Sequence, residues 1–322
     1  MAKLRRAPSG TFSDDASLRL RAAWLYYSHR LTQKEIAEQL GLSRTTVVAL
    51  LEEALKRNEV QIWINEGDQH CVELALRLEK ALRLDEAIVV PSAEDVDQAA
   101  RSVGSALGKF LSEAITDHMA IGVGWGRTLT ASLASFRPPG RQGVKIVSLF
   151  GGILEARTEN PVDYSWRLAS QLNAECFLYP SPLLVDSAAT KRTLRERCGL
   201  DRLDKLAASL DVAVLSVGEV IRSSTSLSRS LIEDRDYREI IERGAVCDVM
   251  CNFLDADGNT VDHPVNERVM SVDLSLLAKA AHVVIACGGS RRAPAIRAAI
   301  RRVGCHTLIT NEGAAQALLA PA

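Results

Sequence analysis

Two helix signals separated by a short turn in residues 31–58, LTQKEIAEQLGLSRTTVVALLEEALKRN, constrain the fold of this chain more than any other feature. Thr32 and Glu35 have the spacing of a capping box, in which each side chain accepts a hydrogen bond from the other residue's backbone N–H. The pair predicts a helix over residues 33–40. Gly41 then supplies the left-handed backbone conformation with which many helices end.

A second helix is expected directly after the turn. Ser43 is a favourable N-cap, and the helix that it opens should reach about residue 57. Ala37 is small enough to let the two helices approach, and the core positions of a helix-turn-helix are apolar: Ile36, Leu40, Leu42, Val47 and Leu50. We interpret the segment as a DNA-binding helix-turn-helix. The alternative is another kind of helical hairpin, which does not require this spacing.

The second helix is expected to enter the major groove with its first turn and one face. Arg44 is the best candidate for reading a base, because its guanidinium can hold a guanine edge with two hydrogen bonds; the alternative is a phosphate contact only. Gln33, at the start of the first helix, is also expected to contact DNA. The expected DNA contacts are Gln33, Ser43, Arg44, Thr45, Thr46, Val48 and Ala49.

The flanking segments complete this domain. Apolar residues at helical spacing over residues 17–27 predict a helix that covers the motif, with Trp24 and Tyr27 in the core. Residues 60–64 alternate apolar and polar side chains, as the strand of a winged helix-turn-helix would. Residues 71–84 are expected to form a connector or a dimerisation helix.

The remainder of the chain alternates short apolar strands with amphipathic helices. The strand candidates are residues 87–90, 119–122, 144–149, 175–179, 212–217, 283–286 and 307–310. This alternation predicts an α/β domain with a mostly parallel, Rossmann-like sheet wrapped by helices. Ligands bind such sheets at the carboxyl ends of the strands, so the loops that follow the strands are the candidate binding site.

Two of these loops are rich in glycine. The first offers backbone amides and a helix start that suit a phosphate, through Gly122, Gly124, Trp125, Gly126, Arg127 and Thr128. It is not the dinucleotide-binding pattern, and a tight turn without a ligand is its alternative. In the second loop, Gly288 and Gly289 lead to Arg292, which could contact an anionic group or could be solvated.

A third candidate is Asp248, in an apolar run before a polar hairpin turn at residues 255–259. Its carboxylate could accept hydrogen bonds from sugar hydroxyls, or it could cap a turn, and the sequence favours neither. No known catalytic motif is present, and the seven cysteines lack the spacing of a zinc site. We therefore expect no metal, no cofactor and no enzymatic activity.

Length and charge agree with two functions in one chain. The 322 residues favour more than one domain. The first sixty carry ten Lys and Arg against seven acidic residues, whereas the whole chain has a net charge of −1. The apolar stretches are strand-sized and no signal peptide is recognisable, so a cytoplasmic protein without a membrane segment is expected. We predict a DNA-binding domain over residues 1–65, a connector or oligomerisation helix over 66–86, and an effector domain over 87–322.

Five segments, taken together, resemble the SorC family of bacterial sugar-responsive regulators over essentially the whole chain. They are LTQKEIAEQLGLSRTTV in the helix-turn-helix, IGVGWGRTL at 121–129, YPSPLLVDS at 179–187, GAVCDVMCNFLDADG at 244–258, and ACGGSRRAPAIRAAI followed by HTLITNEGAAQALL at 286–319. The resemblance implies a sugar-phosphate-isomerase-like effector domain, a tetramer, and a sugar phosphate or polyol effector that changes binding to double-stranded operator DNA.

The resemblance also implies roles for particular residues. The loop on the phosphate side would contain Gly124, Trp125, Gly126 and Thr128, with Gly152, Pro180 and Pro182 beside it, Asp248 as a hydroxyl partner and Arg292 as the cation. Three positions depart from the family's pattern. Arg292 replaces a lysine, Phe150 replaces an asparagine and Asn252 replaces an arginine. The last two changes remove polar or cationic groups, so a free polyol or an unphosphorylated sugar stays open as the effector beside a sugar phosphate.

The expected function is that of a transcriptional regulator, most simply a repressor, of a carbohydrate or polyol catabolic operon. Two other functions stay open at this point. One is a sugar-phosphate isomerase-like enzyme with an appended DNA-binding domain. The other is a non-specific DNA architectural protein, which fits poorly with a large ligand-type domain of mildly acidic charge.

Overall fold

The computed structural model describes residues 14–57, 59–60, 69–92, 95–138, 140–153, 161–222 and 231–320. The chain divides into two compact units, residues 1–66 and 67–322, and each is described by itself. The wing strand expected over residues 60–64 lies outside the described residues except for Val60, which is in a bend. No helix in the described ranges is long and apolar enough to cross a membrane.

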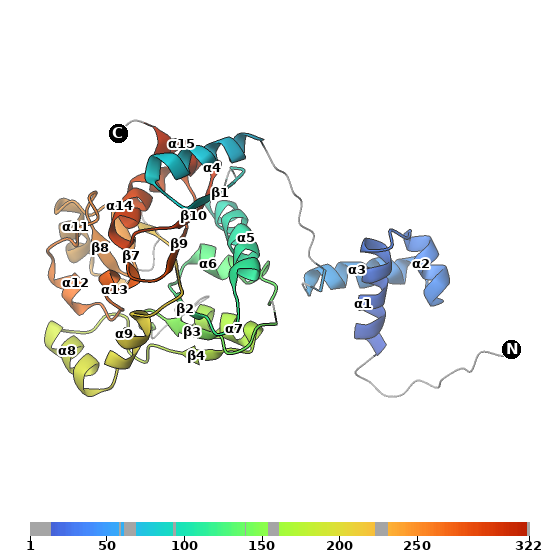
Figure 1. Cartoon of the computed structure of the whole chain (residues 1–322), viewed down its shortest axis with the longest axis horizontal. Helices are drawn as coiled ribbons and strands as arrows, with labels where there is room; N and C mark the ends of the chain where they lie inside the picture. Colours follow the sequence, from blue (N-terminus) through green and yellow to red (C-terminus); the bar gives the residue numbers. More distant parts are fainter. Residues whose placement is uncertain are drawn as a thin grey trace. The chain divides into compact units, whose positions relative to one another are not determined.

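The described residues of the N-terminal unit form three helices, α1 (Asp14–Tyr27), α2 (Gln33–Leu40) and α3 (Arg44–Lys56) (Figure 1). The predicted capping box is confirmed, since the Thr32 hydroxyl accepts from the Glu35 N–H and the Glu35 carboxylate accepts from the Thr32 N–H at 2.8 Å. Gly41 ends α2 with φ 68°, and the Ser43 hydroxyl caps α3 by accepting from the Thr46 N–H. The predicted helix-turn-helix is therefore confirmed.

The prediction for Trp24 is wrong, because 58% of its surface is exposed. The buried stripe of α1 instead contains Ala22, Ala23 and Arg19, which is 6% exposed. Arg19 can occupy this position because its guanidinium pairs with Glu59 through two contacts of 2.5 Å. The buried face of α1 therefore includes a charged residue, Arg19, and differs from the face that the spacing of apolar residues indicates.

The C-terminal unit is built on a seven-stranded parallel sheet, as predicted (Figure 1). Its order is β1-β10-β9-β5-β2-β3-β4. The strands are β1 (Glu86–Val90), β2 (Ala120–Val123), β3 (Lys145–Ser148), β4 (Glu175–Phe177), β5 (Val212–Leu215), β9 (His282–Ala286) and β10 (Thr307–Asn311). All seven match the strand candidates of the sequence.

Helices cover both faces of this sheet. One face carries α5 (Val96–Ala114), α6 (Arg127–Ser132) and α7 (Pro161–Leu172). The other carries α4 (Gln69–Leu82), α9 (Asp201–Ala207), α13 (Leu274–Leu277), α14 (Ala293–Val303) and α15 (Glu312–Leu319). The other helices in the described part of this unit are α8 (Ala188–Arg197), α11 (Asp234–Glu242), α12 (Pro264–Arg268) and the 3-10 turn η1 (Ser290–Arg292). Helix α4, which the sequence suggested as a connector, buries Leu74 and Leu78 in the core of this unit.

A three-stranded antiparallel sheet, which the sequence analysis did not predict, adds to one side of the unit. It contains β6 (Gly218–Glu219), β7 (Cys247–Val249) and β8 (Asn252–Leu254). The tight turn between β7 and β8 places Met250 and Cys251 at φ 51° and 62°. The polar hairpin turn expected at residues 255–259 is confirmed, because the Asp255 carboxylate accepts from the backbone N–H of both Asp257 and Asn259.

The strand order locates the sheet's switch point between β2 and β5. From β2 the chain continues to β3 and then β4 on one side, whereas from β5 it continues to β9 and β10 on the other. Small molecules bind open α/β sheets in the crevice outside the carboxyl ends of the strands at such a point. The loops after β2 and β5 are therefore the structural candidates for a ligand site.

Candidate DNA-binding surface and effector site

The start of α3 presents the residues expected to meet DNA. Ser43 to Thr46 and Ala49 are exposed, Val48 is half-buried, and Val47 and Leu51 beneath them are buried in the core of the N-terminal unit. The Ser43 hydroxyl, besides capping α3, lies 2.8 Å from each of the Thr45 and Thr46 hydroxyls. The first turn of α3 is thus held in one arrangement before any DNA binds.

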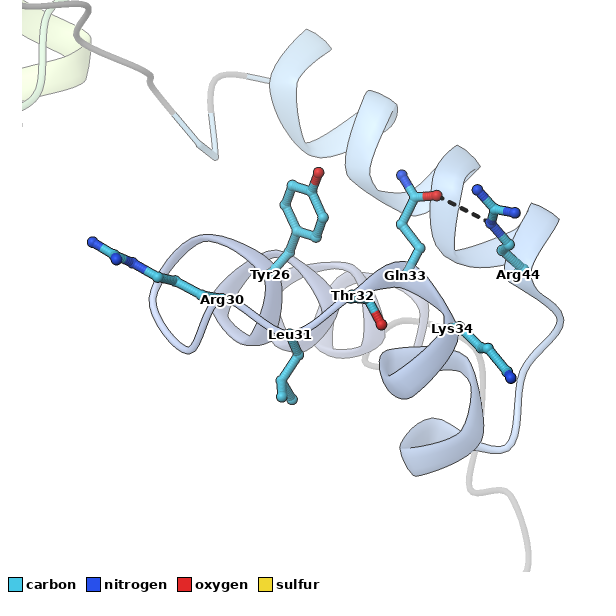
Figure 2. A pocket seen from close by; sticks show the side chains of 7 residues that line it. All are labelled: Tyr26, Arg30, Leu31, Thr32, Gln33, Lys34 and Arg44. Carbon is cyan, nitrogen blue, oxygen red and sulfur yellow. Dashed lines mark hydrogen bonds between the residues drawn. The ribbon is translucent and has the colours of Figure 1, made fainter.

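A hollow of about 570 Å³ lies beside this turn. It is lined by residues from the end of α1, the start of α2 and the start of α3: Tyr26, Arg30, Leu31, Thr32, Gln33, Lys34 and Arg44 (Figure 2). Three of the lining side chains are cationic. The sequence analysis included Gln33 and Arg44 but missed Tyr26, Arg30 and Lys34.

Gln33 and Arg44 are in contact at this hollow. The Arg44 Nε donates a hydrogen bond of 3.3 Å to Gln33 Oε1 (Figure 2). The contact therefore restrains the Arg44 guanidinium at the start of α3.

The loop after β2 lies against the end of β5. The Gly124 N–H donates to the Val214 carbonyl at 2.8 Å, and Gly126, at φ 153°, faces Ser216, whose Cβ would lie 3.1 Å from an added Cβ. Trp125 buries its indole Nε1 without a hydrogen-bond partner among the described residues. This donor and the bare backbone at Gly126 are features that a polar ligand could use.

Three other predicted residues of this loop have different surroundings. Gly122 lies inside β2, where an added Cβ would meet the Leu210 side chain at 2.5 Å, so its small size serves packing. Thr128 is 3% exposed in the first turn of α6. Arg127 is exposed and forms an ion pair of 2.8 Å with Asp97 of α5, which orients it toward that helix.

The loop after β3 packs against the segment that follows β4. The Gly152 N–H donates to the Ser181 carbonyl at 2.9 Å, and Gly152 pairs with Pro182 in an isolated β-bridge. Pro180 is exposed at the start of the same segment. A Cβ on Gly151 would lie 2.6 Å from the Ser181 carbonyl oxygen, so only glycine allows this approach.

The loop after β9 contains the third group of predicted residues. Gly289, at φ 109°, donates its N–H to Asn311 Oδ1 at 2.8 Å. Arg292 is half-buried and turns back so that its Nη1 donates to the Gly288 carbonyl at 3.4 Å. Burial raises the pKa of the neighbouring Cys287 thiol, which keeps it neutral at pH 7.

Asp248 caps a turn, which was one of its two predicted roles. Its Oδ1 accepts from the Cys251 N–H at 2.6 Å and so supports the tight turn between β7 and β8. Its Oδ2 is near Gly218, where an added Cβ would lie 2.9 Å from it. Because β6 follows β5 directly, this contact brings Asp248 toward the switch point, and the capping role does not exclude a ligand role.

The predicted glycine loops are thus arranged on adjacent strands. The order β9-β5-β2-β3 puts the loops containing Gly289, Gly126 and Gly152 at the carboxyl ends of neighbouring strands, with β5 between the first two. Within the described ranges, no three His, Cys, Asp or Glu side chains are grouped in a way that could hold a metal ion.

Comparisons with known proteins agree with both units. The family described as "Putative sugar-binding domain" matches residues 68–320, and "Sigma-70, region 4" matches residues 24–57. The erythritol catabolism regulatory protein EryD of Brucella abortus (strain 2308) is 27% identical over 95% of this chain and 97% of that protein. The deoxyribonucleoside regulator of Bacillus subtilis (strain 168) is 30% identical over 94% of this chain and 97% of that protein.

A solved structure extends the match to the whole fold. The full-length sorbitol operon regulator SorC from Klebsiella pneumoniae superposes with a TM-score of 0.76 at 25% identity, covering 96% of this chain and 100% of that one. A helix-turn-helix joined to a sugar-binding domain defines a DNA-binding transcriptional regulator. The chain belongs to the SorC family of sugar-binding transcriptional regulators.

Proposed function

We propose that this regulator controls an operon for the breakdown of a polyol or sugar, and that the loops at the switch point of the parallel sheet bind the effector. The observation that carries the proposal is the occurrence in one chain of a capped recognition helix and of glycine loops gathered at neighbouring strand ends. Relatives named for erythritol catabolism and for the sorbitol operon support a polyol or its phosphate as the effector.

On the DNA side, Arg44 reads a base, and Ser43, Thr45, Thr46, Val48 and Ala49 contact the adjoining groove and backbone. Arg30 and Lys34, at the hollow, contact phosphates. Phosphate contacts supply affinity and orientation, whereas contacts to base edges supply sequence preference. Of the three cations at the hollow, Arg30 and Lys34 thus supply affinity, and Arg44, the first residue of the recognition helix, supplies sequence preference.

On the effector side, two positions that depart from the family's pattern carry no charge. Phe150 is 2% exposed in the core, and the Asn252 amide donates to the carbonyls of Val249 and Met250 and to the Ser271 hydroxyl. Neither is arranged to bind a phosphate. Arg292 is the cation we assign to the effector, and a ligand with one phosphate or none suits this site.

We further propose that the protein works as a cytoplasmic tetramer, without enzymatic turnover, and that the effector relieves repression. Symmetric oligomers place paired recognition helices on two half-sites, which gives a small module enough contacts for specific binding. Relatives across nearly the whole length are named as regulators, which supports regulation rather than catalysis.

Two variants test the division between the units. Arg44→Ala should weaken binding to the DNA upstream of the protein's own gene by about 1–3 kcal/mol and leave effector binding intact. Arg292→Ala should weaken the response to erythritol, sorbitol or their phosphates and leave DNA binding intact. Fluorescence anisotropy measures both. Equal damage to both activities by either variant would contradict the assignment, and turnover of a sugar phosphate by the purified protein would contradict the absence of catalysis.

A further inference from the structure

Helix α15 lies between a loop of the candidate effector site and helix α4. The helix begins directly after β10, and its N-cap, Asn311, is 4% exposed. The Asn311 Oδ1 accepts from the Gly289 N–H at 2.8 Å and from the Ala314 N–H at 3.4 Å. One carboxamide oxygen therefore joins the loop after β9 to the first turn of α15, so a displacement of Gly289 changes the cap of that helix.

The opposite side of α15 contacts the first turn of α4. Glu312 and Gln316 are one helical turn apart, and the Gln316 Nε2 donates to Glu312 Oε1 at 3.2 Å. His70 of α4 places its Nε2 3.4 Å from Glu312 Oε1 and 3.3 Å from Gln316 Nε2. Figure 1 shows α4 and α15 side by side, and they share the core around Leu74 and Leu318.

The loop after β1 also contacts the first turn of α15. The Gly313 N–H donates to the Ser92 hydroxyl at 2.8 Å, and the Ser92 N–H lies 3.5 Å from Glu312 Oε2. The Ser290 Cβ would be 3.8 Å from a Cβ on Gly313. The start of α15 is thus hydrogen-bonded to the loops after both β1 and β9.

The chain order gives this arrangement its significance. In the described part of the chain, α4 is the first helix after the recognition helix α3. The start of α4, which contains His70 in its first turn, is therefore the helical part of the C-terminal unit that is nearest in sequence to the DNA-binding unit.

We propose that Asn311, Glu312, Gln316 and His70 form a relay that transmits the state of the effector loop to the DNA-binding unit. The inference rests on the proposed function and names the residues through which its regulation passes. A ligand bound by residues 288–292 changes the hydrogen bond that the Gly289 N–H donates to Asn311. Asn311 transmits this change to the first turn of α15, and His70 transmits it from α15 to α4. Coupling between two sites is reciprocal, so DNA bound by the N-terminal unit must also change the effector loop.

The reciprocal effect allows a test with DNA as the only ligand. The full-length protein is mixed with a duplex from the DNA upstream of its own gene, and hydrogen exchange is followed in peptides that cover residues 287–292 and 311–316. In the wild type, the duplex should change exchange in both peptides by at least about threefold. The variant His70→Ala with Gln316→Ala should bind the same duplex within about twofold yet show no such change.

The control is Arg77→Ala, at an exposed position of the same helix, which should behave as the wild type. A random-sequence duplex separates specific from non-specific effects. If the double variant binds the duplex and its effector loop still responds, or if the wild-type loop does not respond to a duplex that it binds specifically, the relay is refuted. If the wild type fails to prefer its own upstream DNA, the proposed function fails first and the relay with it.

Discussion

The Arg44 guanidinium donates its Nε hydrogen to the Gln33 carboxamide oxygen, across 3.3 Å between the first residues of α3 and α2. The sequence suggested both residues as independent DNA contacts. The structure joins them, so Gln33 can contribute to DNA binding through Arg44. Preorganising a long side chain lowers the conformational entropy that its contact with DNA would otherwise cost.

Gln33→Ala should therefore weaken specific DNA binding by about 0.5–1.5 kcal/mol, the usual net value of one hydrogen bond. In an Arg44→Ala background the same substitution should cost almost nothing, because Gln33 then has no guanidinium to orient. Fluorescence anisotropy on the specific duplex measures this double-mutant cycle. Gln39→Ala, an exposed amide in the same helix, is the control. Full additivity of Gln33→Ala and Arg44→Ala would show that Gln33 contacts DNA on its own.

Arg30→Ala and Lys34→Ala should weaken binding to specific and random duplexes alike. Each removes a cation from the hollow, and a phosphate contact carries no information about base sequence. The slope of log K against log salt concentration should fall by about one for each substitution. Lys56→Ala, at the far end of α3, is the matched control. A change in sequence preference without a change in slope would place these residues against bases instead.

Glu59→Gln should destabilise the N-terminal unit by about 1–3 kcal/mol at pH 7, because it weakens a charge-assisted pair with the buried Arg19. The hydrogen bonds from Arg19 hold the pKa of Glu59 below its ordinary value. The contribution is therefore fully present above about pH 4.5 and disappears as pH falls through the lowered pKa. Hydrogen exchange in α1 and α3 between pH 7 and pH 3 measures it.

The exposed pair of Glu53 and Arg57 provides the comparison for this experiment. Their side chains are 41% and 57% exposed, so solvent screens the pair and Glu53→Gln should change the stability of the N-terminal unit much less than Glu59→Gln. Equal effects of Glu59→Gln and Glu53→Gln at pH 7 would show that burial of Arg19 does not strengthen its pair.

Asp248→Asn separates the two roles of this residue. The asparagine oxygen can still accept from the Cys251 N–H, so the turn between β7 and β8 should persist and the melting temperature should change little. Loss of the negative charge should reduce the response of DNA binding to a polyol. Asp248→Ala should in addition lower stability by about 1–3 kcal/mol, because the buried amide loses its acceptor. A normal effector response in Asp248→Asn would leave Asp248 as a turn cap alone.

The sequence predicted those features that depend on neighbouring residues. The capping box of Thr32 and Glu35, the left-handed Gly41 and the Ser43 cap are local, so the bounds of α2 were correct to the residue. The central strands β2, β5 and β9 of the parallel sheet are largely apolar because they are buried, which makes them recognisable without knowing their partners.

The features that the sequence did not predict depend on residues that are distant in the chain. The three-stranded antiparallel sheet has strands too short to show a pattern, and its strand β6 pairs with β7, which is distant from it in the chain. The hollow combines Tyr26 and Arg30 with Arg44, which belongs to another helix. Trp24 was assigned to the core because the sequence does not show that Arg19 is neutralised by Glu59, forty positions away.

The most direct test of the account is effector-controlled binding of the full-length protein to a labelled duplex from the DNA beside its own gene. Fluorescence anisotropy is read at one fixed salt concentration, with a random duplex as control, in the presence of erythritol, sorbitol, erythritol 4-phosphate or sorbitol 6-phosphate. The account predicts specific binding that one of these compound classes weakens by about 5- to 150-fold, corresponding to a coupling of about 1–3 kcal/mol. Binding that never exceeds the random-duplex level, or specific binding that no polyol or polyol phosphate alters, would contradict it.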